Sequence, residues 1–145
     1  MHEYLERVWH DIGSLGSAAA FGILLFFLFF YDVTLFFRFF TGGMLLFGAT
    51  SLIRIAYFKE RPLAKPYSSR IGKIDAASFP STHAARGSLV LTLLWPGLSS
   101  QLRIPLAILA LLICTSRIAR RRHDSIDVIA GLILGIIVGW AILQF

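Results

Sequence analysis

The chain has few charged residues, few acids and one cysteine. Charged side chains make up 15% of its 145 residues, only eight are Asp or Glu, and 57% are apolar. This composition excludes an intrinsically disordered chain and argues against a freely soluble globule. The single cysteine, Cys114, excludes a disulfide within the chain. In a chain this apolar, the formal net charge of +6 points to anionic lipid or phosphate rather than to nucleic acid.

The chain contains long apolar runs, and in lipid only helices or closed barrels satisfy the backbone hydrogen-bonding groups of such runs. Polar and apolar residues do not alternate along them, as they would in a barrel strand. We therefore predict an all-α integral membrane helical bundle, a single domain over residues 1–145 with about five transmembrane helices. A tight polar turn is expected at 99–103, and a loop from Pro62 to Phe79. The predicted transmembrane helices are 17–31, 34–58, 82–98, 104–118 and 126–145.

Residues 1–16 predict a different kind of helix. Tyr4, Leu5, Val8 and Ile12 follow helical spacing, which is typical of an amphipathic helix lying in the membrane interface. Three acids and one arginine do not form the positive region of a cleaved signal peptide, so we expect this segment to be retained.

Two arginines close the second predicted span. Arg54 and Arg61 are seven residues apart, just under two helical turns, and the spacing predicts that they share one face. Two guanidinium groups on one stripe suit a phosphate. Taken alone, the pair is equally well explained as interfacial arginines that snorkel toward headgroups.

The sequence PSTH begins the third predicted span. Ser81, Thr82 and His83 would offer backbone N–H groups, a hydroxyl and a side chain that titrates near neutrality to an anion at a helix N-terminus. Taken alone, these residues also fit an N-capping serine beside an unrelated histidine.

A histidine and an aspartate lie one turn apart before the fifth span. His123 and Asp127 share a face, where the carboxylate can hold the imidazole in one tautomer. The same row continues through Gly131, Gly135 and Gly139, which favours close packing of a neighbouring helix and places the pair inside the bundle. A buried aspartate in a membrane protein needs a partner or a function.

Five alternating spans bring these motifs to one membrane face. Together, RxxxxxxRP (Arg54 to Pro62), PSTH and SRxxxxxHxxxD (Ser116 to Asp127) resemble the signature of the type-2 phosphatidic acid phosphatase family, whose active site is related to that of vanadium haloperoxidases. Two positions depart from the usual pattern, since the family generally has Lys at Arg54 and Gly at Thr82. Arginine keeps the charge with another geometry, and threonine narrows the pocket.

The resemblance implies a role for each motif residue. It implies His123 as a nucleophile that forms a phosphohistidine, Asp127 as the residue that orients it, and His83 as the general acid. The phosphoryl oxygens would be bound by Arg54, Arg61, Ser81, Thr82 and Arg117. Phosphoryl transfer needs mainly positioning and charge stabilisation. No cluster has the spacing of metal ligands, so we expect no cofactor and no metal.

The resemblance thus implies a metal-independent lipid phosphate or pyrophosphate phosphatase, with a membrane lipid phosphate as its only expected partner. A surplus of cations suggests a polyanionic substrate, although these residues also fit a basic rim that contacts the membrane: Lys65, Arg70, Lys73, Arg120, Arg121 and Arg122. Arg86, one turn beyond His83, could join the site or have a structural role.

Three other functions are weighed from the residues alone. A phosphotransferase would use the same chemistry and stays open. A lipid-binding protein would need only the arginines, so the two histidines and the aspartate argue against it, and an anion transporter would need a charged path across the bundle, which the sequence lacks. The family usually works on the outer face of the cytoplasmic membrane, so we expect a bacterial inner membrane protein with a periplasmic site. The cationic excess at this face points the other way by the positive-inside rule.

Overall fold

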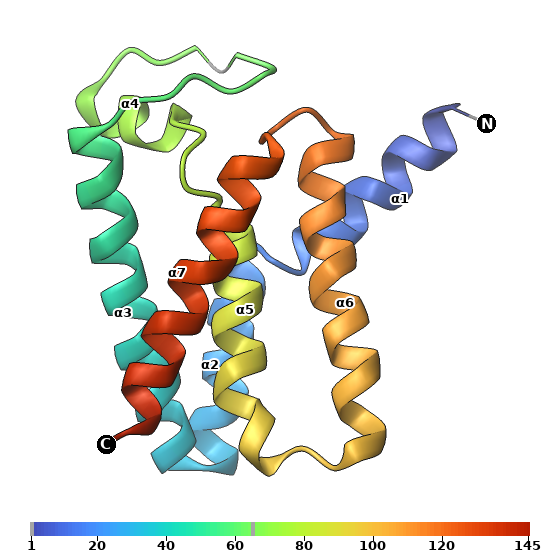
Figure 1. The fold of residues 1–145 in the computed structure, drawn as a ribbon, viewed down its shortest axis with the longest axis vertical. Helices are drawn as coiled ribbons and strands as arrows, with labels where there is room; N and C mark the ends of the chain where they lie inside the picture. The colour runs from blue at the N-terminus through green and yellow to red at the C-terminus, as the bar shows by residue number, and fades with distance from the viewer. Residues whose placement is uncertain (1, 65) are drawn as a thin grey trace.

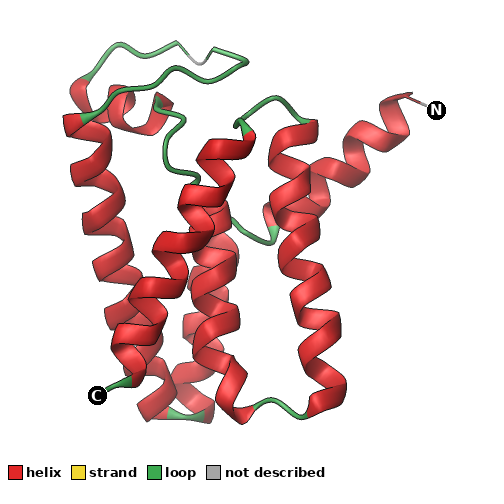
Figure 2. Ribbon diagram, in the orientation of Figure 1, coloured by secondary structure: helices red, strands yellow, loops and turns green. Residues whose placement is uncertain are grey.

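A computed structural model describes residues 2–64 and 66–145. The described part of the chain is helical and contains no strand, which confirms the predicted all-α class (Figures 1 and 2). The elements are α1 (His2–Ser14), α2 (Ala18–Tyr31), α3 (Val33–Ala56), α4 (Arg70–Ala76), α5 (Thr82–Leu94), the 3₁₀ helix η1 (Trp95–Gly97), α6 (Ser100–Ala119) and α7 (Ser125–Leu143).

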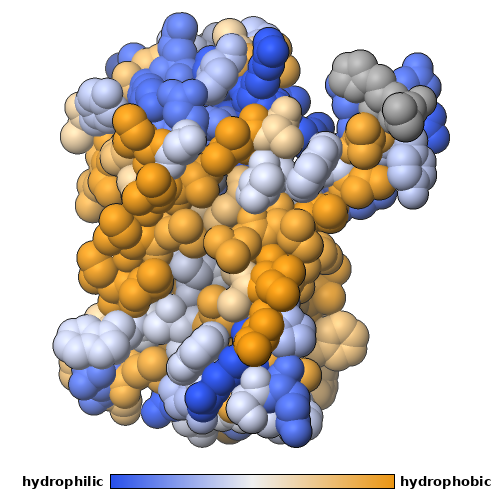
Figure 3. Space-filling view, turned by 45° about the vertical axis from the view of Figure 1, so that its right-hand side comes forward, coloured by the Kyte–Doolittle hydropathy of each residue, from blue (hydrophilic) through white to orange (hydrophobic). Residues whose placement is uncertain are grey.

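The helices form an integral membrane protein. Within the described residues, α3, α6 and α7 are long and apolar enough to cross a membrane, and α1 with α2, bent by 43° between them, make a possible fourth span. Apolar surface forms a band between two hydrophilic ends (Figure 3). At 13 residues, α5 is only about 20 Å long. The first turn of α5 lies lower in the view than the upper ends of α3, α6 and α7 (Figure 1).

Several predicted boundaries are wrong. Helix α3 ends at Ala56, before the predicted end at residue 58, and α6 already begins at Ser100, inside the predicted polar turn. A short helix, α4, lies within the predicted loop because the Ser69 hydroxyl accepts a hydrogen bond from the Gly72 amide at 3.0 Å and caps its first turn.

The glycine row of α7 packs against α5. A Cβ atom at Gly131 would collide with the Ser81 carbonyl oxygen, and one at Gly135 with the Ala85 carbonyl oxygen. Only glycine allows this approach, so the close packing predicted from the sequence is present. The seam fixes the start of α7 against the start of α5.

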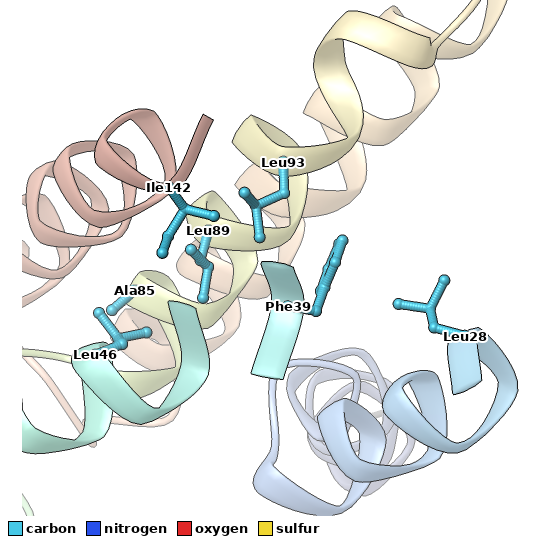
Figure 4. Packing of buried hydrophobic residues seen from close by; sticks show 7 residues of the cluster. All are labelled: Leu28, Phe39, Leu46, Ala85, Leu89, Leu93 and Ile142. Carbon is cyan, nitrogen blue, oxygen red and sulfur yellow. The ribbon is translucent and has the colours of Figure 1, made fainter. Parts of the chain in front are cut away.

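An apolar core joins the same helices. Phe39 of α3 and Leu89 of α5 have no exposed surface, and Figure 4 shows them among side chains from α2, α3, α5 and α7. The cluster consists of Leu28, Phe39, Leu46, Ala85, Leu89, Leu93 and Ile142. This core holds α3, α5 and α7 together, and these three helices carry much of the polar end.

The bend between α1 and α2 contacts the polar end directly. The Ser17 hydroxyl caps α2 by accepting from the Ala20 amide at 3.1 Å, and an Arg86 guanidinium nitrogen donates to the Gly16 carbonyl at 2.9 Å. A Cβ atom at Gly16 would lie 3.2 Å from the Cβ of His83. We call residues 13–17 the elbow.

The α5–α7 seam predicts unequal effects for two glycine substitutions. Gly135→Ala should lower the Tm of the purified protein, because the new methyl group collides with α5 backbone. Gly48→Ala in α3 should leave the Tm unchanged or raise it, because a Cβ there meets no atom within 4 Å and alanine is about 0.5–1 kcal/mol better than glycine in a helix. Equal changes in Tm would contradict the packing described here.

Candidate active site

The polar end collects residues from four segments that are far apart in the sequence. Arg54 lies in the last turn of α3, and Arg117 in the last turn of α6. His83 lies in the first turn of α5, and His123 and Asp127 flank the start of α7. The structure therefore brings the predicted motif residues to one end of the bundle, the upper end in Figure 1.

His123 and Asp127 lie together but not in direct hydrogen-bond contact. Both are buried, and His123 Nδ1 is 3.8 Å from Asp127 Oδ2. The Ser78 hydroxyl lies between them: it donates a short hydrogen bond to Asp127 Oδ2, and its oxygen is 3.4 Å from His123 Nδ1. The predicted pairing of histidine and aspartate thus passes through a serine that the sequence analysis missed.

Lys59 is the cation beside Asp127. Its Nζ atom lies 2.7 Å from Asp127 Oδ1 and 2.8 Å from Asp124 Oδ2. Burial lowers the pKa of Lys59, but the hydrogen bonds to Asp124 and Asp127 outweigh it and raise the pKa above its usual 10.5. Lys59 is therefore a permanent charge in the site. It lies two residues before Arg61, outside the motif positions, and no local spacing signals its role.

Two arginines are held by the end of α4. Arg54 donates to the Ile74 carbonyl at 3.1 Å and to the Pro80 carbonyl at 2.9 Å, and Arg61 donates to the Asp75 carbonyl at 2.6 Å. Cations favour the carbonyl end of a helix. The predicted shared helical face is wrong, because α3 ends at Ala56. The two guanidinium groups are instead brought together by α4.

Buried polar nitrogen atoms remain without partners at this end. Within the described residues, Arg54 Nε, Arg61 Nε, Arg117 Nε and His83 Nδ1 have no hydrogen-bond partner. A buried unpaired polar group costs about 1–3 kcal/mol, more when charged, so an anion within reach of these arginines would be favoured. Arg103 Nε, at the opposite end, is also unpaired, but its guanidinium lies 5.3 Å from the ring centre of Trp95.

The start of α5 is organised by its cap. Ser81 is fully buried, and its hydroxyl accepts from the Ala84 amide at 3.5 Å. Its own amide donates to the Asp127 carbonyl at 2.9 Å. Thr82, with Arg86, lines a small cavity of about 60 Å³ between α2, α3 and α5. Ser81 thus has the capping role that the sequence analysis left open, while its hydroxyl hydrogen stays available to a ligand.

The imidazole of His123 is neutral at pH 7. Burial, then the positive charges of Arg117 and Arg61, lower its pKa to about 4, although Asp127 and a hydrogen bond to the backbone of Ser78 oppose the shift. A neutral imidazole carries a lone pair on one ring nitrogen and a hydrogen on the other. Nδ1 faces Ser78, so Nε2 is the nitrogen left for other chemistry.

The remaining predicted cations lie at or near the surface. Arg70, Lys73 and Arg121 are exposed, Arg120 and Arg122 are half-buried, and Lys65 lies outside the described residues. The Lys73 ammonium lies 5.0 Å from the ring centre of Phe58. Arg86 has the elbow contact given above. No group of three or more His, Cys, Asp or Glu side chains that could hold a metal occurs in the part of the chain described.

Comparison with known proteins gives the same assignment as the motifs. The chain is 34% identical over 95 residues to the undecaprenyl-diphosphatase BcrC of Bacillus subtilis (strain 168), a match that covers 65% of this chain and 49% of that protein. The chain thus spans about half the length of this curated relative.

Two crystal structures share the fold. That of Aquifex aeolicus LpxE has a TM-score of 0.84 and 25% sequence identity, over 100% of this chain and 88% of that one. That of a transmembrane PAP2-type phosphatidylglycerolphosphate phosphatase from Bacillus subtilis has a TM-score of 0.69 and 22% identity, over 98% and 76% of the two chains. The second likeness concerns the fold alone.

The PAP2 superfamily matches residues 56–145, more than half of the chain, including the PSTH and SRxxxxxHxxxD motifs. The match begins two residues after Arg54, the position that departs from the usual first motif. The resemblance drawn from the three motifs is thereby confirmed, and the chain belongs to the PAP2 superfamily.

Proposed function

We propose that the protein is a metal-independent lipid phosphate or pyrophosphate phosphatase that works through a phosphohistidine. The observation that carries the proposal is a neutral, buried His123 whose Nδ1 is engaged by Ser78, beside guanidinium groups with unpaired Nε atoms. Family membership supports the reaction class. A pocket that only bound phosphate would need the cations but not this histidine arrangement.

The reaction proceeds in two transfers. His123 Nε2 attacks phosphorus, the bond to the leaving oxygen breaks, and His83 donates its proton to that oxygen. Water then attacks the phosphohistidine, His83 accepts a proton from it, and inorganic phosphate leaves while His123 is restored. Arg54, Arg61 and Arg117, with the Ser81 hydroxyl and the Thr82 amide, stabilise the phosphoryl oxygens.

Charge stabilisation by arginines takes the place of a metal in this proposal. Positive groups aimed at the transferring phosphoryl group supply most of the rate enhancement in such reactions. The positive charges of Arg61 and Arg117 also act on His123 electrostatically and help to keep its imidazole neutral. A bound phosphate dianion, in turn, favours the protonated form of His83 that the first transfer requires.

The substrate in this proposal is amphiphilic. An apolar cavity of about 350 Å³ lies between α2, α5 and α6, and the elbow and Arg86 line it together with leucines. Its volume falls within the usual range for ligand sites. The elbow also contacts His83, so an alkyl chain in the cavity would join its headgroup beside the general acid.

The headgroup that we propose carries more than one negative group. The rim residues Arg120, Arg121 and Arg122 lie next to Arg117 and add charge beyond what one phosphate needs. Candidates are undecaprenyl pyrophosphate, phosphatidylglycerophosphate and the 1-phosphate of lipid A. The name of the undecaprenyl-diphosphatase among the similar proteins supports a polyanionic lipid.

We place the active site on the outer face of a bacterial inner membrane, following the resemblance to the family. A phosphotransferase, in which a second alcohol replaces water in the second transfer, is the alternative with the same first step. Analysis of the products separates the two activities.

The proposed reaction predicts that His123→Ala abolishes phosphate release. Loss of the nucleophile removes the covalent route, so activity should fall by at least the ~10²–10⁴-fold of a lost proton-transfer group. The measurement is free phosphate from purified protein with a panel of lipid phosphates in EDTA. His10→Ala, on the exposed side of α1, should match the wild type. Near-native turnover by folded His123→Ala, or loss in EDTA that Mg²⁺ restores, would refute the proposal.

Neutralising the rim tests the proposed headgroup. Replacing Arg120, Arg121 and Arg122 together with Gln should reduce kcat/KM on a lipid pyrophosphate more than on phosphatidic acid, because only the former has a second anionic group to bind. The assay uses neutral detergent at fixed salt, and Arg38→Gln at the opposite end is the control. Equal changes on both lipids would leave the rim as a membrane contact only.

Filling the apolar cavity tests the proposed site for the alkyl chain. Val90→Trp should lower kcat on a long-chain lipid phosphate about tenfold or more, because displacing the reacting atoms by ~1 Å can cost about 10²-fold. Turnover of a soluble aryl phosphate should not change. Ala107→Trp, which fills a separate apolar cleft between α5, α6 and α7, is the control. An effect of Val90→Trp on both substrates, or on neither, would exclude this site.

A further inference from the structure

We propose that Ser78 and Lys59 are positioning residues for the nucleophile: Ser78 bridges His123 to Asp127, and Lys59 holds Asp127 in place as a carboxylate. The inference rests on the proposed function, in which His123 attacks through Nε2. It adds two residues to a mechanism that the motifs describe with histidine and aspartate alone.

The hydrogen-bond directions determine the tautomer of His123. A serine hydroxyl has one hydrogen, and Ser78 donates it to Asp127 Oδ2. The hydroxyl can therefore offer only a lone pair to His123 Nδ1 at 3.4 Å. Nδ1 must carry the ring hydrogen to complete this contact, which leaves the lone pair of the neutral ring on Nε2.

The carboxylate cannot perform this task alone. Asp127 Oδ2 is 3.8 Å from His123 Nδ1, beyond hydrogen-bond distance, and it already accepts from the Asp124 amide at 3.0 Å. Oδ1 accepts from Lys59 at 2.7 Å. Each oxygen is thus held by other donors, and the serine transmits the fixed position of the carboxylate to the imidazole.

Lys59 and Ser78 are also tied to each other through the backbone. The Ser78 amide donates to the Lys59 carbonyl at 2.7 Å. One peptide contact therefore joins the segment after α3 to the segment before α5, and both side chains reach Asp127 from it. The Lys59 ammonium and the Ser78 hydroxyl are therefore already in position beside Asp127 when no substrate is bound.

A buried carboxylate makes Lys59 necessary. Asp127 has no exposed surface, and an unpaired buried charge is strongly destabilising. The charged and titratable groups that face it are Lys59, Asp124, His123 and Arg54. Lys59 is the cation among them with a direct contact to the carboxylate, so its removal should loosen Asp127 and, through Ser78, His123.

The test compares Ser78→Ala with Ser88→Ala. Ser88 is a buried serine of α5 whose hydroxyl donates to its own helix, to the Ala85 carbonyl, so it controls for loss of a buried hydroxyl. Ser78→Ala should lower kcat about 10- to 100-fold, with KM within about twofold. This is the loss typical when the hydrogen-bond partner that orients a metal-ligating histidine is removed. Ser88→Ala should leave both unchanged.

Lysine substitutions test the second half of the inference. Lys59→Met should lower kcat with little change in KM, and Lys59→Arg should restore most of it, because a guanidinium can still donate to both carboxylates. Arg38→Met, which removes a cation of α3 at the opposite end of the bundle, is the control. Loss of activity in Lys59→Arg equal to that in Lys59→Met would overturn the role assigned to this charge.

A spectroscopic reading separates this inference from the proposed function. In protein labelled with ¹⁵N-histidine, with His123→Gln to assign the signals, His123 should be the Nδ1–H tautomer in the wild type and a tautomer mixture in Ser78→Ala. This holds whether or not the protein hydrolyses lipids. An unchanged tautomer in Ser78→Ala would overturn the inference. Absence of phosphohistidine in wild type with the expected tautomer would instead overturn the proposed reaction.

Discussion

The buried carboxylate of Asp127 is the interaction around which the polar end is built. It accepts from Lys59, Ser78 and the Asp124 amide, and its backbone carbonyl accepts from the Ser81 amide. These contacts join the segment after α3, the start of α5 and the start of α7. A charge placed without solvent needs such partners, so the electrostatic requirement of one side chain also fixes how three helices meet.

The same end holds more positive than negative charge, and this imbalance has a structural cost. Arg54, Arg61 and Arg117 keep unpaired Nε atoms although carbonyl oxygens of α4 and of the link to α5 satisfy part of the first two. Like charges close together repel, and burial removes the water that would screen them. This end of the bundle is therefore less stable without an anion than with one. Such an imbalance of charge is what favours the binding of a phosphate.

Prediction from sequence succeeded where a spatial arrangement depends on local spacing. His123 and Asp127 lie four residues apart on one helical row, and the glycines that continue the row do pack on α5. It failed where a contact depends on tertiary structure: Lys59 and Asp127 are 68 residues apart, and Ser78 and Asp127 are 49 apart. Helical periodicity carries no information about such pairs.

The boundaries show the same limit. The apolar run through residue 98 predicts a full span, yet α5 ends at Leu94 and begins below its neighbours (Figure 1). The depth of that start is set by the link from α4, which runs down into the bundle and carries Ser78 and Ser81. Hydropathy reports that a segment is apolar but not the depth at which it begins.

The recessed start of α5 has a consequence for recognition in the proposed function. It places His83 next to the elbow, where the headgroup region and the apolar cavity meet. An alkyl chain that moves from the bilayer into this cavity gains little hydrophobic free energy, because lipid is as apolar as leucine side chains. The cavity therefore contributes orientation rather than affinity, and discrimination among lipids rests on the arginines around the phosphate and on the charges of the rim.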